Sequence, residues 1–233
     1  MTIMTAGGFV VASMPPALPP RVPPRLVLLD RDGVINEDVG APGVVDVADL
    51  RLIPGAAAAL GRLRRTPCAA RVALVTNQSC VGKGLLSPRG LDRIHDAMRR
   101  LLRDADADAG VDAIYACLSR REDGDPRMKP GPGMVSEALR DFGVGGAEAV
   151  FVGDTLTDMQ AAKTGGVELR VLVETGYGRG LMGDHSAPQH PVLVTRVDSP
   201  YADDGTPFVY ARNLEAAAAW LHANVATSTD FTC

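Results

Sequence analysis

The sequence is poor in the features that mark several classes of protein. No uninterrupted apolar stretch reaches the ~18–20 residues that a membrane span requires. Aromatic residues make up only 4% of the chain, too few to suggest a surface on which nucleic-acid bases stack. The net charge is -4, so there is no excess of Lys and Arg to bind a phosphate backbone. These absences argue against a membrane protein and against a general nucleic-acid binder.

Cysteine is also scarce. The four cysteines are scattered and form no C-x-x-C pair. A chain of 233 residues does not need disulfides to fold, so we expect free thiols in a reducing compartment and a cytoplasmic protein. The 46% of hydrophobic residues is enough for one substantial core, and it predicts a soluble globular protein.

The first 24 residues differ from the rest. They contain no Asp or Glu and six of the 17 prolines, which predicts a flexible, extended lead-in. An acid-poor segment also fits a transit peptide, in which case the protein would be organellar. The first basic residue is Arg21, however, later than a secretory signal would place it. We therefore expect a lead-in at 1–24, one domain at 25–225 and a tail at 226–233.

After the lead-in, strand and helix patterns alternate. Short apolar runs typical of strands buried on both faces lie at 25–30, 72–76, 111–117, 149–153 and 168–173. Helical patterns lie at 55–65, from Ser87-Pro88 onward, at 133–142 and at 158–164. This rhythm predicts an α/β fold, a three-layer α/β/α sandwich with a mainly parallel, Rossmann-like sheet.

Two further regions complete the expected fold. A Gly-, Pro- and His-rich stretch at 176–206 predicts a long loop, which a strand at 208–210 and a helix at 213–222 follow. On the long helix after Pro88, we expect His95 at the surface rather than at a metal. The same helix has an apolar face formed by Leu91, Ile94, Met98, Leu101 and Leu102.

Polar side chains follow the expected strands where each one ends. Asp30 and Asp32 follow the first strand, and Asp154 follows the fourth. The carboxyl ends of parallel strands share one edge of a sheet, so these carboxylates are expected to meet. Clustered carboxylates repel one another and commonly hold a cation, and hard oxygen ligands favour Mg²⁺.

The same edge is expected to receive groups that suit an anion. Thr76 and Asn77 end the second strand, and Lys129 lies in a loop after the third. A lysine beside a metal ion suits a phosphate group. Asp30 and Asp32 are two residues apart, so one can act as nucleophile while the other transfers protons. The pattern predicts metal-assisted phosphoryl transfer through an aspartyl-phosphate.

These residues resemble the four motifs of the haloacid dehalogenase-like phosphatases. The motifs here are Asp30-x-Asp32-Gly33-Val34, Thr76-Asn77, Lys129 and Gly153-Asp154-x-x-x-Asp158. The segments LLDRDGVIN, LVTNQSCVGKG, KPGPGM and FVGDTLTDMQAA are similar to the heptose-bisphosphate and histidinol-phosphate phosphatases of subfamily IIIA. The resemblance implies the fold of this superfamily without a separate cap domain, and a Mg²⁺ cofactor.

The resemblance also implies a role for each carboxylate. Asp30 would attack phosphorus, and Asp32 would protonate the leaving oxygen and then activate water. Asp30, the backbone carbonyl of Asp32 and Asp154 would hold Mg²⁺. Asp158 would orient the lysine or the metal shell.

The remaining motif residues are implied to bind substrate. Thr76 and Lys129 would bind the phosphoryl oxygens, and Asn77 would help to position the substrate.

Three departures from the group bear on cofactor and substrate. Many relatives carry a zinc loop, but here Ser119 replaces its histidine, and residues 120–128 contain no cysteine, so we expect no zinc. Met128 stands where relatives have Arg, with Arg127 as a possible substitute, and Thr155 stands where relatives often have Lys.

The sequence therefore predicts a monomeric Mg²⁺-dependent phosphatase that acts on a small phosphate ester. The best candidate substrate is D-glycero-heptose 1,7-bisphosphate or a similar sugar phosphate, and histidinol phosphate is an alternative. A catalytically idle relative that binds a phosphometabolite is a second alternative. A nucleic-acid 3′-phosphatase would need a basic groove, of which the sequence gives no sign.

Overall fold

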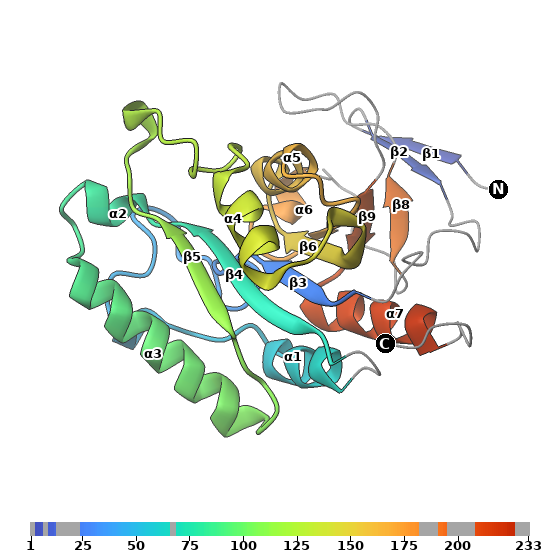
Figure 1. Cartoon of the computed structure of the whole chain (residues 1–233), viewed down its shortest axis with the longest axis horizontal. Helices are drawn as coiled ribbons and strands as arrows, with labels where there is room; N and C mark the ends of the chain where they lie inside the picture. The colour runs from blue at the N-terminus through green and yellow to red at the C-terminus, as the bar shows by residue number, and fades with distance from the viewer. Residues whose placement is uncertain are drawn as a thin grey trace.

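The computed structural model describes residues 3–6, 9–12, 24–65, 69–181, 191–194 and 208–226. Within these ranges all strands belong to one sheet, in the order β1-β2-β8-β9-β7-β6-β3-β4-β5 (Figure 1). The strands are β1 Ile3–Ala6, β2 Phe9–Ala12, β3 Leu26–Leu29, β4 Arg71–Asn77, β5 Ala113–Cys117, β6 Ala149–Gly153, β7 Leu169–Val173, β8 Val192–Val194 and β9 Phe208–Ala211.

The expected parallel sheet is confirmed. The pairs β3–β4, β4–β5, β3–β6, β6–β7 and β7–β9 are parallel, whereas β1, β2 and β8 add an antiparallel edge. β3 lies between β4 and β6, as expected for a fully buried strand.

Helices cover both faces of the sheet (Figure 1), which confirms the three-layer sandwich. Side chains alternate along a strand, so Val27 and Leu29 pack with α1, α3 and α7, and Leu26 and Leu28 pack with α4 and α5. The helices are α1 Ala56–Arg64, α2 Ser79–Gly82, α3 Pro88–Ala105, α4 Gly133–Phe142, α5 Leu156–Thr164, α6 Gly178–Leu181 and α7 Leu214–Ala226, with 3₁₀ turns η1 Val47–Asp49, η2 Arg121–Asp123 and η3 Gly146–Glu148.

The long helix α3 begins where its capping signal predicts. Ser87 is the N-cap, and its hydroxyl accepts a hydrogen bond from the backbone N–H of Gly90 at 3.0 Å. Leu91, Ile94, Met98 and Leu102 are buried as expected. Leu101 is 40% exposed, so its assignment to the buried face was wrong. It lies about 100° around the helix from Leu102, at the edge of the buried face, where its side chain still reaches solvent.

The ends of the chain hold more structure than the sequence indicated. The lead-in contributes β1 and β2, and the expected loop at 176–206 contributes α6 and β8. Residues 13–23, which hold five of the lead-in prolines, lie outside the described residues, as do 182–190, 195–207 and the tail 227–233. No helix in the described part of the chain is long and apolar enough to cross a membrane.

Candidate active site

Lys129 lies at the centre of the residues that follow the strand ends. Its Nζ is 2.9 Å from Oδ1 of Asp30 and 2.7 Å from Oδ1 of Asp158, and it donates a hydrogen bond to the carbonyl of Val75 at 2.8 Å. The side chain is only 3% exposed. The two carboxylates raise the pKa of Lys129 despite its burial, so it remains a buried cation.

Asn77 fixes the backbone of this lysine. Its Nδ2 donates to the carbonyl of Lys129 at 3.1 Å, and its Oδ1 accepts from the N–H of Lys129 at 3.0 Å. Both polar atoms of the amide are therefore used on Lys129, which follows β5 and precedes α4. The sequence linked Asn77 to substrate, whereas in the structure its amide holds the lysine.

Asp30 directly follows β3 and presents its two oxygens differently. Oδ1 accepts a hydrogen bond from the backbone N–H of Arg31 at 2.7 Å and also forms the ion pair with Nζ of Lys129. Oδ2 has no hydrogen-bond or ion-pair partner within the described residues. Burial, and then Asp158 and Asp32, raise the pKa of Asp30 to about 7 against the opposing effect of Lys129.

Asp154 directly follows β6 and lies in a cradle of two glycines. A Cβ at Gly33 would lie 2.2 Å from its Oδ2, and a Cβ at Gly176 would lie 2.0 Å from the same atom. Both glycines also have positive φ, at 78° and 62°, which side chains disfavour. The carboxylate accepts the N–H of Tyr177 at 2.9 Å. Burial, and then Asp158 and Asp30, raise the pKa of Asp154 to about 8.

The N-terminal cap of α5 fixes the orientation of the Asp158 carboxylate. Thr155 is the N-cap, and its N–H and hydroxyl donate to Oδ2 of Asp158 at 3.0 and 2.7 Å. The hydroxyl of Thr155 is thus engaged in capping the helix. With Oδ2 held in this way, Oδ1 of Asp158 faces Lys129.

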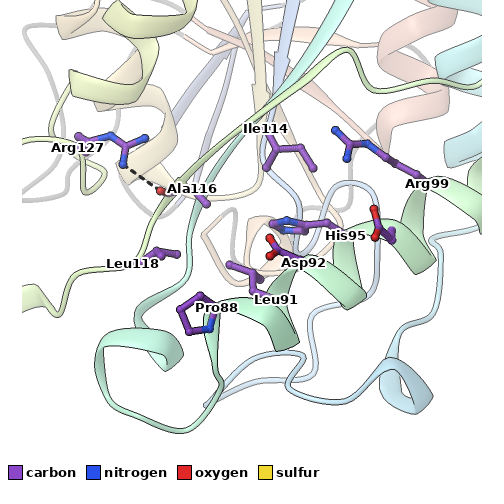
Figure 2. Close-up of a pocket in the computed structure, with 10 residues that line it drawn as sticks. Pro88, Leu91, Asp92, His95, Arg99, Ile114, Ala116, Leu118 and Arg127 are labelled. Atoms are coloured by element: carbon purple, nitrogen blue, oxygen red, sulfur yellow. Dashed lines mark hydrogen bonds between the residues drawn. The ribbon is translucent and has the colours of Figure 1, made fainter.

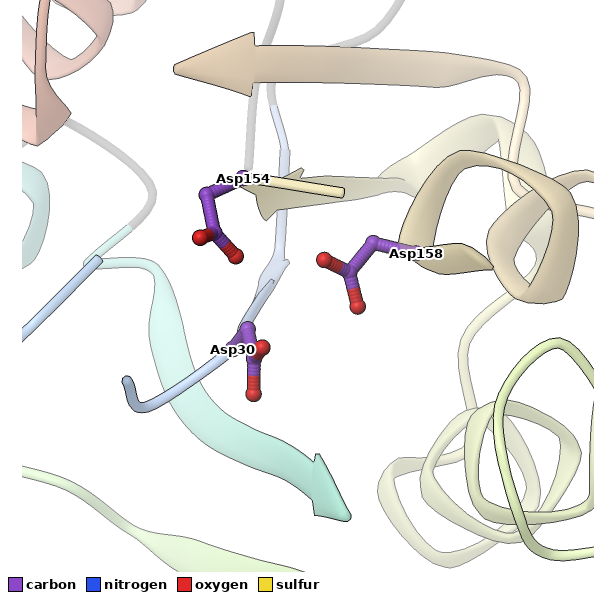
Figure 3. Close-up of side chains that lie close together, drawn as sticks. All are labelled: Asp30, Asp154 and Asp158. Carbon is purple, nitrogen blue, oxygen red and sulfur yellow. The ribbon is translucent and has the colours of Figure 1, made fainter. Parts of the chain in front are cut away.

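The three carboxylates converge (Figure 3). One oxygen each from Asp30, Asp154 and Asp158 lies within 4.8 Å of the others, close enough to share a metal ion. Lys129 lies against Asp30 and Asp158, whereas Asp154 has no ion-pair partner within the described residues. The region around Asp30 and Asp154 is therefore where a further positive charge fits.

The carboxylate of Asp32 lies among a separate set of hydrogen-bond donors. Nη2 of Arg31 contacts its two oxygens at 3.1 and 2.9 Å, and Nδ2 of Asn36 donates to Oδ1 at 2.8 Å. Nε2 of Gln78 donates to Oδ2 at 3.1 Å and also to the Thr76 hydroxyl at 2.9 Å. Burial alone would raise the pKa of Asp32, but Arg31 and these amides outweigh it and lower the pKa.

Several of these partners were not found from the sequence. Arg31 has no exposed surface, and His95, expected at the surface of α3, is only 6% exposed, so that expectation was wrong. Nη1 of Arg31 lies 3.3 Å from Nε2 of His95. Gln78 adjoins the Thr76-Asn77 motif, and this proximity was the one signal available for it.

Asp125 accepts hydrogen bonds from the end of β5 and from the segment that follows it, where the sequence predicts no zinc site. Its Oδ2 accepts from Cys117 Sγ at 3.5 Å and from Ser119 Oγ at 2.6 Å. Arg127 pairs with Glu137 at 3.0 Å and donates to the carbonyl of Ala116 at 3.2 Å. Arg127 is therefore held against α4 and β5 rather than against Lys129.

Comparison with known proteins defines the family. A family model described as HAD-hydrolase-like matches residues 127–198. D-glycero-beta-D-manno-heptose-1,7-bisphosphate 7-phosphatase of Bordetella bronchiseptica is 39% identical over 165 residues, covering 71% of this chain and 89% of the relative. D-glycero-D-manno-heptose-1,7-bisphosphate 7-phosphatase of Thermosynechococcus vestitus is 33% identical, covering 86% of this chain and 96% of the relative.

A solved structure agrees with the sequence relatives. The D,D-heptose 1,7-bisphosphate phosphatase of B. bronchiseptica, complexed with magnesium and phosphate, superposes with a TM-score of 0.70 at 34% identity. The match covers 84% of this chain and 97% of that chain. The chain belongs to the haloacid dehalogenase-like hydrolase family, and the resemblance inferred from its four motifs is confirmed.

Proposed function

We propose that this chain is a Mg²⁺-dependent phosphatase that works through an aspartyl-phosphate on Asp30. The observation that carries the proposal is the asymmetry of the Asp30 carboxylate. Lys129 and the Arg31 N–H hold Oδ1, while Oδ2 has no partner within the described residues and can attack phosphorus. Lys129 supplies positive charge beside the transferring phosphoryl group, and Thr76 lies at the end of the neighbouring strand β4.

The donor set fits a magnesium ion. Asp30 and Asp154 offer hard carboxylate oxygens, and burial first and then the neighbouring carboxylates raise their pKa values, an effect that Lys129 only partly opposes. Asp30, Asp154 and the backbone carbonyl of Asp32 would hold the ion, and Asp158 would keep Lys129 in place. When bound, Mg²⁺ supplies charge neutralisation for the phosphoryl oxygens.

The reaction divides into two steps. In the first, Oδ2 of Asp30 forms a bond to phosphorus and the ester P–O bond breaks. Asp32, whose pKa is low in the substrate-free site, takes up a proton when the anionic substrate binds and gives it to the leaving oxygen. In the second, Asp32 takes a proton from water as the water oxygen bonds to phosphorus, and the bond between Asp30 and phosphorus breaks. Free phosphate leaves, and Asp32 is protonated again for the next turnover.

The substrate that we propose is D-glycero-D-manno-heptose 1,7-bisphosphate, cleaved at the 7-phosphate. The support is the likeness to two 7-phosphatases of this name over most of their length. The cytoplasmic location, the monomeric state and the division of the chain at residues 24 and 225 stay predictions of the sequence.

The 1-phosphate of the proposed substrate is not cleaved and needs cations that bind it. Two arginines near the site are suited to this role. Arg179 and Arg212 line a pocket of about 560 Å³ together with Thr175 and Gly176. Thr175 donates to the carbonyl of Gly33 at 2.6 Å, so this pocket adjoins the loop that carries Asp32. Both arginine side chains are exposed, but Nε of Arg179 lies 3.3 Å from the buried Glu174, whereas Arg212 has no carboxylate partner within the described residues. We assign Arg212 to the 1-phosphate.

Substrate selectivity tests this assignment. We expect kcat/KM for the heptose bisphosphate to exceed that for heptose 7-phosphate by at least about tenfold, because a phosphate paired with Arg adds binding energy. Arg212→Ala should lower kcat/KM about tenfold for the bisphosphate and less than about twofold for the 7-phosphate. Arg62→Ala, at an exposed position on α1, is the matched control. Equal losses on both substrates would contradict the role of Arg212, and no turnover of either would contradict the proposed substrate.

Thermal unfolding tests the metal site. Asp30 and Asp154 bind protons more tightly in the metal-free fold than in the unfolded chain, with pKa values of about 7 and 8 against 3.8. Their contribution to stability is therefore present below about pH 4 and is lost as the pH rises through 7 to 8. Mg²⁺ displaces these protons, so its stabilising effect grows over the same pH range.

We expect Mg²⁺ at one hundred times its Kd to add about 2.7 kcal/mol, or roughly 5–10 °C in Tm, at pH 8. At the same Mg²⁺ concentration, the Tm shift should be smaller at pH 6, because protons on Asp30 and Asp154 compete with the ion. Asp154→Asn should abolish it, and Asp49→Asn, at an exposed position on η1, should not. A Tm shift in Asp154→Asn equal to that of the wild type would contradict the assignment of Asp154 as a ligand.

A further inference from the structure

His95 and Arg31 form a chain of contacts that ends on Asp32. Arg31 is fully buried, with Nη2 on both oxygens of Asp32 and Nη1 3.3 Å from Nε2 of His95. Nε of Arg31 has no partner within the described residues. The direction of the guanidinium therefore depends on two side-chain contacts, one to Asp32 and one to His95.

The chemistry of the contact fixes the state of the histidine. A guanidinium group donates hydrogen bonds and accepts none, so Nε2 of His95 must be the acceptor. The ring then carries its proton on Nδ1 and is neutral. Burial, and then Arg31 and Arg99, lower the pKa of His95 to about 4, which agrees with a neutral ring at working pH.

His95 is held on a rigid element. It lies on α3, an 18-residue helix whose residues Ile94, Met98 and Leu102 are buried in the core. The ring lines a cavity of about 570 Å³ between α3 and β5 (Figure 2), beside Asp92, Asp96, Arg99 and Ile114. A neutral acceptor on such a helix gives Arg31 a fixed anchor on the side opposite Asp32.

We propose that His95 is a positioning residue, which through Arg31 aims the carboxylate of Asp32 at the water that hydrolyses the phosphoenzyme. The inference rests on the proposed function. Arg31 touches both oxygens of Asp32, whereas Asn36 and Gln78 each touch one, so the plane of the carboxylate depends on Arg31. Without the acceptor at His95, Nη1 would be left unpaired in the core, and the guanidinium would turn to find another partner.

The two half-reactions separate this role from a general disturbance of the fold. With 4-nitrophenyl phosphate the leaving group needs no proton, so kcat/KM reports phosphoenzyme formation without the proton transfer by Asp32. Hydrolysis of the phosphoenzyme still needs Asp32 as base, and with such a good leaving group we expect this second step to limit kcat. A variant that misaligns Asp32 should therefore lower kcat and spare kcat/KM.

We expect His95→Leu to lower kcat for 4-nitrophenyl phosphate about tenfold, to change kcat/KM less than about twofold, and to slow phosphoenzyme decay after rapid mixing by the same factor as kcat. His95→Gln places an amide oxygen near the position of Nε2 and should restore kcat to within about threefold of the wild type. His95→Asn, whose amide is too short to reach Arg31, should behave as His95→Leu and serves if the leucine variant does not fold.

Equal losses in kcat and kcat/KM, an unchanged kcat in His95→Asn, or a folded His95→Gln as slow as His95→Asn would each overturn the inference. A wild-type enzyme without any phosphatase activity would instead overturn the proposed function, so the two failures are distinguishable.

Discussion

Replacing Asp30 with Asn is expected to lower kcat by at least about 10⁴-fold, because the amide cannot form the phosphoenzyme. The loss should be the same for the heptose bisphosphate and for 4-nitrophenyl phosphate, since both must pass their phosphoryl group to Oδ2. The measurement is steady-state phosphate release at saturating Mg²⁺.

The fold should tolerate this change. Asn has the shape of Asp, and burial raises the pKa of Asp30, which means that the charged form is disfavoured at this position. Lys129 keeps its contact with Asp158 at 2.7 Å. We therefore expect a Tm within a few degrees of the wild type. A folded Asp30→Asn protein that keeps a tenth of the activity would contradict the assignment of the nucleophile.

Replacing Lys129 with Met should be costly to both stability and activity. The change leaves Asp30 and Asp158 facing each other in a buried site and removes the donor to the carbonyl of Val75. Breaking one partner of a buried ion pair costs about 3–5 kcal/mol, and we expect a loss in this range by urea unfolding without metal. Turnover should fall by at least about 10²–10³-fold, because the transferring phosphoryl group loses its cation.

The double variant Lys129→Met with Asp158→Asn separates the two effects. Removing the unpaired charge of Asp158 should recover a large part of the lost stability and none of the activity. A single Lys129→Met variant that is destabilised by less than about 1 kcal/mol would show that Lys129 is not the charge that holds this cluster together.

The main features of the site could be predicted because parallel strands end at one edge of a sheet. Asp30 and Asp154 follow the adjacent strands β3 and β6, and Thr76 lies in β4 on the other side of β3. A strand pattern with a polar residue at its end is visible in a sequence. The order of the motifs is therefore enough to predict that these residues lie at one edge of the sheet.

The partners of these residues could not be predicted in the same way. From the sequence, an arginine within a turn motif is expected to be a solvent-exposed charge. The burial of Arg31 depends on His95, which lies 64 residues further along the chain. The clamp of Asn77 on the Lys129 backbone requires the loop between β5 and α4 to return to β4. The strands β1 and β2 depend on pairing with β8, from the opposite end of the chain.

The most direct test of the account is to trap the phosphoenzyme. The enzyme is mixed with the heptose bisphosphate and Mg²⁺, quenched in acid within the first turnover, and treated with borohydride, which reduces an aspartyl-phosphate to homoserine. Peptide mass spectrometry then locates the modified position. We expect homoserine at position 30 in the wild type and none in Asp30→Asn. Modification at Asp32 or Asp154 instead, or steady turnover with no modified carboxylate, would contradict this expectation.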